Sequence, residues 1–221
     1  MNFGAARLGF WFRDSPVEQF VNLNFEEGTL GWTLVTSRIR LNGGSTLAGW
    51  PTPTDPDPFP NGSPGDVTAI DTMPGFSYLL DTVDKPPLGQ VQSMKLTLGG
   101  SPDGVVSAGA IMFGPAIYSN NAVTFKVGDT MAFDWRAVPG SDAYNIEVYM
   151  VEQSTGAVIQ LLRGTGVDAS AGTPWATFSR VIGSGEAGNY KFVFISGSFD
   201  STFGTVIGGS LLIDNIRRIR P

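Results

Sequence analysis

The chain has 221 residues, of which 42% are hydrophobic and 15% are charged, and its 29 glycines and 15 prolines favour a single all-β domain joined by tight turns. Its formal net charge of −6 argues against a nucleic-acid partner, because binding to phosphates requires a basic face. It has no histidine and no cysteine, which excludes His- and Cys-based catalytic triads, disulfides and zinc–thiolate sites.

Residues 1–19 have the pattern of an arm that precedes the first strand. Aromatic side chains crowd into it between charged residues, among them Phe10, Trp11 and Phe12. Either these rings pack back on their own domain or they dock on a neighbouring subunit, because an exposed aromatic patch usually marks an interface. Two arginines interrupt the apolar stretch, so we expect no signal peptide, and no apolar run is long enough to span a membrane.

The segment 50–66 differs from everything around it because it contains six prolines. Proline has no N–H group to donate to a β-ladder, so this segment is predicted to be a long loop inserted into the domain. Long loops in compact domains are often functional. Trp50 and Phe59 are therefore the best candidates for contacting a glycan or a protein partner.

The rest of 20–221 alternates strands with turns and predicts about ten antiparallel strands in a jelly-roll β-sandwich. Period-two alternation predicts two core-facing sets: Met131, Phe133 and Trp135, and then Tyr144, Ile146, Val148 and Met150. The same alternation turns Glu147 outward, where we expect a solvated side chain.

Four segments carry a family resemblance. They are NLNFEEGTLGWTL (22–34), QSMKLTLGG (92–100), TPWATFSRVI (173–182) and GGSLLIDNIRRI (208–219). In this order they resemble jelly-roll domains of the carbohydrate-binding-module type, in the galactose-binding-like superfamily. The resemblance implies a non-catalytic sandwich that binds a polysaccharide.

Other segments are similar to virion structural proteins of tailed bacteriophages, especially those that infect marine cyanobacteria. The likeness lies in the sequence around the proline-rich loop (42–66), in 144–162 and in 189–216. It implies a protein made in the host cytoplasm and located in the virion, which self-associates or docks on other virion proteins as a capsid decoration, neck or tail component. We take this virion role as the leading expectation and a carbohydrate-binding module as the alternative.

The resemblance to the carbohydrate-binding type also implies a structural calcium ion. The matching positions are Glu26, Glu27 and Asp214, which would tie the first motif to the last strand. Carboxylate oxygens are the ligands that Ca²⁺ prefers. The alternative is that Asp214 accepts from turn amides and that Glu26 is solvated.

Hydrolysis by paired carboxylates is the third hypothesis, with Glu147 and Glu152 as the candidate residues. Asp134 and Arg136 could pair with these side chains across strands, and a surface salt bridge explains them more simply than an active site does. We therefore expect no enzyme activity.

Overall fold

The computed structural model describes residues 22–35, 37–42, 67–72, 76–87, 90–99, 110–141, 144–167, 172–198 and 207–221. The predicted arm and the proline-rich loop, with Phe10, Trp11, Phe12, Trp50 and Phe59, lie outside these residues. The contacts predicted for both segments therefore stay predictions.

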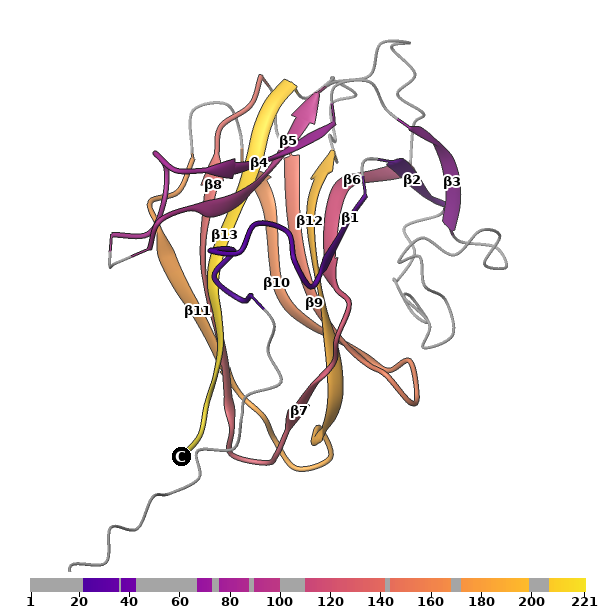
Figure 1. The fold of residues 1–221 in the computed structure, drawn as a ribbon. Helices are drawn as coiled ribbons and strands as arrows, with labels where there is room; N and C mark the ends of the chain where they lie inside the picture. Colours follow the sequence, from indigo (N-terminus) through magenta and orange to yellow (C-terminus); the bar gives the residue numbers. More distant parts are fainter. Residues whose placement is uncertain are drawn as a thin grey trace, which may run out of the picture.

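Within the described residues, thirteen strands form two antiparallel sheets that pack face to face (Figure 1). Sheet A has eight strands: β1 (Trp32–Val35), β2 (Ser37–Asn42), β3 (Val67–Thr72), β6 (Ala110–Ser119), β7 (Val123–Phe125), β9 (Tyr144–Glu152), β10 (Val158–Val167) and β12 (Gly188–Ser198). Sheet B has five strands: β4 (Ser77–Asp81), β5 (Ser93–Gly99), β8 (Thr130–Val138), β11 (Ala176–Val181) and β13 (Ile207–Ile219). No helix long and apolar enough to cross a membrane occurs in the part of the chain that the structure describes.

The strand orders are β10-β9-β12-β6-β2-β3 in sheet A and β11-β8-β13-β5-β4 in sheet B. Most strands that are neighbours in a sheet are distant in sequence. Two antiparallel sheets that pack face to face confirm the prediction of an all-β, jelly-roll-type sandwich. The described residues form thirteen strands where about ten were predicted. Among them, β1 and β2 follow each other closely in sequence and both pair with β6.

The hydrophobic core lies between the two sheets. The side chains predicted to face it on β9, namely Tyr144, Ile146, Val148 and Met150, are all fully buried. On β8, Met131 and Phe133 are fully buried, whereas Trp135 packs only partly buried against the edge of the core. The Phe133 ring lies 5.0 Å from that of Phe178 and 5.3 Å from that of Phe194 between ring centroids, so it links β8 to β11 and to the opposite sheet.

Tyr144 supplies a polar link between the sheets. Its side chain is buried on β9 of sheet A, and its hydroxyl lies 2.6 Å from the carbonyl oxygen of Val138 and 2.8 Å from that of Ser210. These two carbonyls belong to β8 and β13 of sheet B. One phenolic hydrogen is therefore shared between two backbone carbonyls of the opposite sheet.

Candidate functional site

The outer face of sheet A carries a row of polar and aromatic side chains. The pairing of the strands puts Gln160 of β10 opposite Tyr149 of β9, Tyr149 opposite Val193 of β12, and Val193 opposite Tyr118 of β6. The row faces away from the core because the residues between its members on β9 and β12 point into it. Gln160 is exposed, whereas the two tyrosines are 6% and 8% exposed.

Glu147 joins this row, and its predicted solvation is wrong. It does lie on the outer face, but it is only 1% exposed. Its Oε2 accepts hydrogen bonds from the hydroxyl of Tyr149, at 2.5 Å, and from the side-chain amide of Gln160, at 2.8 Å. A buried carboxylate needs such partners, because burying it without them is costly. Alternation along β9 predicted the correct face but could not show that this face is covered.

Glu152 has a different role from the one considered for catalysis. Its Oε2 accepts from the backbone N–H and the hydroxyl of both Ser154 and Thr155, at 2.6–2.9 Å, so it organises the β9–β10 turn. The hydrogen bond from the Ser154 hydroxyl is the main cause that lowers the pKa of Glu152, to about 2. The bonds from Thr155 act in the same direction, and together they outweigh the effect of burial, which raises the pKa. The pairing expected for these carboxylates with Asp134 or Arg136 is wrong, because both of those residues lie on β8 of the other sheet.

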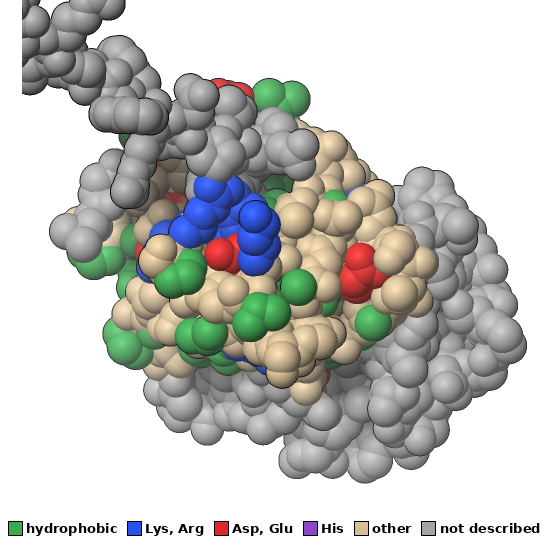
Figure 2. Space-filling model, turned by 90° about the horizontal axis from the view of Figure 1, so that it is seen from below, with side chains coloured by type: hydrophobic (Ala, Val, Ile, Leu, Met, Phe, Trp, Pro, Cys, Tyr) green, Lys and Arg blue, Asp and Glu red, His purple; other side chains and the backbone are tan. Residues whose placement is uncertain are grey.

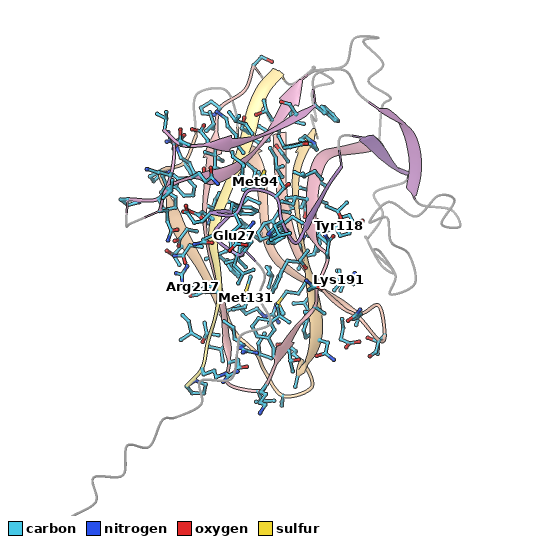
Figure 3. All side chains as sticks on the ribbon, in the orientation of Figure 1. Glu27, Met94, Tyr118, Met131, Lys191 and Arg217 are labelled. Carbon is cyan, nitrogen blue, oxygen red and sulfur yellow. The ribbon has the colours of Figure 1, made fainter. Side chains whose placement is uncertain are left out.

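Lys191 adds a positive charge beside the row. It lies on β12 opposite Val151, two residues before Val193, and therefore on the same face. Figure 3 labels Lys191 and Tyr118 to the right of the core residues Met94 and Met131. Among the described residues, Lys191 takes part in no ion pair. The face thus presents the amide of Gln160 and the ammonium group of Lys191, while Glu147, Tyr149 and Tyr118 are buried in it.

A second polar site lies on β13 and depends on the first motif of the sequence. Residues 22–31 form an irregular loop that Figure 1 draws in indigo across β13. The side chain of Asn22 closes this loop, donating to the carbonyls of Gly28 and Leu30 and accepting from the N–H of Glu27. Phe25 is fully buried and stacks near Trp32, with ring centroids 5.2 Å apart. These contacts explain why the motif contains Asn, Phe, Gly and Trp.

A β-bulge in β13 receives the loop. The pairing of β13 with β8 shifts by one residue between Asp214 and Arg217, and Asn215 takes a positive φ of 50°. The bulge leaves the N–H of Ile216 available, and it donates to the carbonyl of Leu23 at 3.1 Å. Phe25 also has a positive φ, of 55°, which is costly for a non-glycine residue and is held by its burial.

Asp214 is the unusual residue of this site. It is fully buried, and its Oδ1 accepts from the N–H of Asn215 at 2.6 Å, whereas its Oδ2 has no hydrogen-bond partner among the described residues. Burial raises the pKa of Asp214 to about 7, and the nearby carboxylates of Glu26 and Asp134 add to the effect. A buried carboxylate oxygen without a donor, close to two further carboxylates, is an environment that a cation would stabilise.

Of the three residues predicted to hold calcium, Asp214 forms this site. The charge of Glu26 contributes to the raised pKa of Asp214, while the Oε1 of Glu26 accepts from the N–H of Val91 at 2.7 Å. Glu27 is exposed, and its backbone, rather than its carboxylate, is tied into the loop. Sequence reasoning missed Asp134, which the strand pairing places directly opposite Asp214.

The carboxylates near Asp214 could supply some of the ligands of a calcium ion, but not all of them. Within the described residues, no three acidic side chains cluster as a metal site. Asp134 is also engaged, by Thr177 at 2.6 Å, by Asn215 at 2.8 Å and by Arg217. Asp214 and Glu26 would therefore supply the carboxylate ligands, and backbone carbonyls and water would have to complete the six to eight oxygens that Ca²⁺ requires.

No protein-family model and no curated protein matches the sequence. Among solved structures, the chain is similar to TmCBM61, solved with β-1,4-galactotriose, at 11% identity and a TM-score of 0.47, covering 92% of this chain and 99% of that one. It is also similar to Caldicellulosiruptor saccharolyticus CBM27-1, solved with mannohexaose, at 13% identity and a TM-score of 0.47, covering 90% and 95% of the two chains.

A third similar structure is the enzymatically active domain of tailspike protein 4 of bacteriophage CBA120. The identity is 10% and the TM-score is 0.43, with 92% of this chain covered. The match spans only 21% of the tailspike chain. At identities this low, the functions of these three proteins do not carry over to this chain.

Proposed function

We propose that this chain is a non-catalytic carbohydrate-binding module that recognises a glycan on the outer face of sheet A. The observation that carries the proposal is the hydrogen-bonded set of Glu147, Tyr149 and Gln160 on that face. This set lies on the side of β9 and β10 that faces away from sheet B, so it does not belong to the core between the sheets.

The chemistry of this face suits a sugar. Amide and ammonium groups bind the hydroxyl groups of a sugar, whereas the rings of Tyr149 and Tyr118 are too buried to stack on it. Gln160 is the exposed member of the set, and Lys191 lies nearby on β12, so these two residues would meet a ligand first. Glu152 serves as a turn residue, so it is not available to pair with Glu147 in hydrolysis.

Calorimetric titration with neutral oligosaccharides tests the proposal, with β-1,4-galactotriose and mannohexaose as the first probes and a glycan array to extend them. Replacing Gln160 with alanine is expected to weaken binding by roughly fivefold, the usual effect of losing one hydrogen bond of about 1 kcal/mol to a neutral ligand. Gln153→Ala is the matched control, because Gln153 is an exposed glutamine in the β9–β10 turn, outside the row. The control should bind as the unmodified protein does.

Absence of binding to every glycan would overturn the proposal. Equal affinities for the Gln160→Ala and Gln153→Ala variants would move the site away from sheet A. Trp50→Ala then tests the proline-rich loop, where the sequence placed Trp50 and Phe59 as candidate contacts. Loss of binding in that variant alone would assign the glycan to the loop.

We further propose calcium as a structural cofactor, held by Asp214 and Glu26. The buried and unpartnered Oδ2 of Asp214 supports this proposal. A cation there would join the loop 22–31 to β13 and stabilise the folded state by linkage, without taking part in glycan recognition on the opposite sheet.

Assembly in a virion is a second candidate function, and an exposed apolar cluster favours it. Val181 of β11 and Ile219 of β13 both pair with Thr130 of β8 and are 62% and 48% exposed. Val127, in the adjoining β7–β8 turn, is 57% exposed. Figure 2, which shows this end of the molecule from below, has apolar side chains around a group of Lys and Arg side chains. Such a cluster is typical of a protein–protein contact, here with a second copy of the chain.

Light scattering coupled to size exclusion tests this second function. The protein is expected to self-associate, and Val181→Lys is expected to return it to a monomer, because the lysine adds a charge among the apolar side chains that the contact would bury. Val83→Lys is the control. Val83 is an exposed valine, at 90%, but it belongs to the β4–β5 loop and not to the elements that carry the apolar cluster. A protein that is monomeric at all concentrations and binds no virion protein would contradict this function.

A further inference from the structure

The outer face of sheet B carries a cationic and aromatic row that neither function above uses. The strand pairing puts Lys95 of β5 opposite Leu212 of β13, and Leu212 opposite Arg136 of β8. Trp175 directly precedes β11 and continues the row beyond Arg136, since the next residue, Ala176, pairs with Trp135. These side chains face away from the core, because their neighbours Met94 and Leu211 are buried within it.

The loop between β4 and β5 folds over this row and places one carboxylate on it. Oδ1 of Asp84 lies 2.6 Å from a terminal nitrogen of Arg136 and accepts a hydrogen bond from the indole N–H of Trp175 at 3.0 Å. The carbonyl of Asp84 accepts from the hydroxyl of Ser93 at 2.6 Å, which ties the loop to β5. Asp84 thus occupies a position where an Arg and a Trp side chain both donate to one carboxylate oxygen.

A second carboxylate of the same segment contacts the other cation of the row. Asp81, the last residue of β4, lies 3.6 Å from the ammonium group of Lys95. Its Oδ1 also accepts from the N–H groups of Val83 and Asp84, at 2.9 Å each. Burial raises the pKa of Asp81, but these N–H groups and Lys95 outweigh burial and bring the net pKa below its usual value. Asp81 therefore shapes the loop that delivers Asp84.

Asp84 satisfies Arg136 only partly. It contacts one terminal nitrogen, while Nε of Arg136 is buried and has no hydrogen-bond partner among the described residues. A guanidinium group binds a carboxylate best with two parallel N–H groups. The side chains of Arg136 and Asp84 are 36% and 23% exposed, so solvent and ligands reach this pair.

We propose that Arg136 and Trp175 form a binding site for the carboxylate of an acidic saccharide, and that Asp84 occupies this site when no ligand is bound. The ligand carboxylate takes the place of the Asp84 carboxylate on the guanidinium and indole N–H groups. It also gains the second guanidinium N–H that Asp84 leaves unused.

Two features favour a saccharide with repeated carboxylates. Trp175 is only half-buried, and its indole ring offers a flat apolar surface on which a pyranose can stack. Lys95 and Arg136 lie on strands separated by one strand, β13, and therefore about 10 Å apart. A polyuronate carries a carboxylate on every sugar, so one chain can reach both cations. This site is on the opposite sheet from the proposed neutral-glycan face and depends on the proposed function only in that the ligand is a saccharide.

The test is calorimetric titration with oligogalacturonate and, as the uncharged control, with its methyl ester. Asp84→Asn removes the internal carboxylate while keeping its size, and is expected to bind oligogalacturonate at least tenfold more tightly than the unmodified protein. Adding Arg136→Gln to that variant is expected to abolish the binding, and the methyl ester is expected not to bind either. Binding of the neutral probes to sheet A should be unchanged in Asp84→Asn, which separates a failure of this site from a failure of the proposed function.

Equal affinities of the unmodified protein and Asp84→Asn for oligogalacturonate would overturn the proposal. Binding of the methyl ester or of polyglutamate as tightly as oligogalacturonate would overturn the assignment to an acidic saccharide. If Asp84→Asn does not fold, the unmodified protein still decides the matter. The NMR signal of the Trp175 indole N–H, assigned with Trp175→Phe, should shift on titration with excess oligogalacturonate, and an unmoved signal contradicts the site.

Discussion

In the presence of a metal chelator, the free energy of unfolding is expected to fall by roughly 4 kcal/mol between pH 4 and pH 7 because of Asp214 alone. The pKa of this fully buried carboxyl rises from its ordinary value of 3.8 to about 7, through burial first and then through Glu26 and Asp134. Between these two values the folded state holds a proton that the unfolded state has released. Stability is therefore lost as the pH rises, at about 1.4 kcal/mol for each pH unit.

Asp214→Asn isolates this contribution. Asparagine keeps the shape of the side chain but has no charge, so the variant is expected to be more stable than the unmodified protein at pH 8 in chelator. Other carboxyl groups titrate in both proteins, and Glu152, whose pKa is lowered to about 2, loses its stabilising interactions only as the pH falls below about 4.5. The difference between the two urea-unfolding curves, measured from pH 4 to pH 8, therefore reports Asp214.

Calcium is expected to narrow the difference in stability between the two proteins. A cation that binds the Asp214 carboxylate at a hundredfold excess over its dissociation constant stabilises the folded state by about 2.7 kcal/mol, which offsets part of the roughly 4 kcal/mol that the buried charge costs at pH 8. The unmodified protein should gain this stability at pH 8, and Asp214→Asn should gain little. Equal gains in the two proteins would place any calcium elsewhere. Stability curves that run parallel across the pH range in chelator would show that the pKa of Asp214 is not raised.

Phe133→Ala is expected to destabilise the fold by about 4 kcal/mol, the usual cost of removing a large buried ring from a core. Phe133 is fully buried and contacts aromatic rings from both sheets, Phe178 at 5.0 Å and Phe194 at 5.3 Å between centroids. The substitution removes both contacts and leaves a cavity between the sheets. In a domain of this size the midpoint of thermal unfolding should fall by roughly 10 °C.

Urea unfolding measures this loss, with Val83→Ala as the control at a 90% exposed position. The control should stay within about 0.5 kcal/mol of the unmodified protein. Phe133→Leu, which keeps most of the apolar volume, should fall between the two. A loss of less than about 1 kcal/mol in Phe133→Ala would mean that the two sheets do not pack through this ring.

Alternation along single strands predicted the core well. Met131, Phe133, Tyr144 and Ile146 are buried as expected, because side chains two residues apart share a face wherever a strand is paired on both sides. The same pattern failed for Glu147. It shows which face of the sheet a residue occupies but not whether that face is covered, and the buried state of Glu147 depends on tertiary contacts.

Some residues of the candidate sites were indicated by the sequence, and others only by the pairing of distant strands. Glu26 and Asp214 came from a resemblance between motifs at opposite ends of the chain, and in the structure the charge of Glu26 contributes to the raised pKa of Asp214. Asp134 was overlooked as their neighbour because only the pairing of β8 with β13 places it opposite Asp214. The contact of Asp84 with Arg136 and Trp175 joins three elements that are far apart in sequence, and no local pattern indicates it.

The sequence by itself determined the all-β class, the exclusion of His- and Cys-based chemistry and the core-facing sets on β8 and β9. These properties follow from composition and from a two-residue period, which act locally along the chain. The tertiary structure alone decided that Glu147 is buried, that Glu152 closes a turn and that Asp84 sits on Arg136. Each of these depends on which distant strands pair and which loop covers which face, and many pairings share the same local pattern.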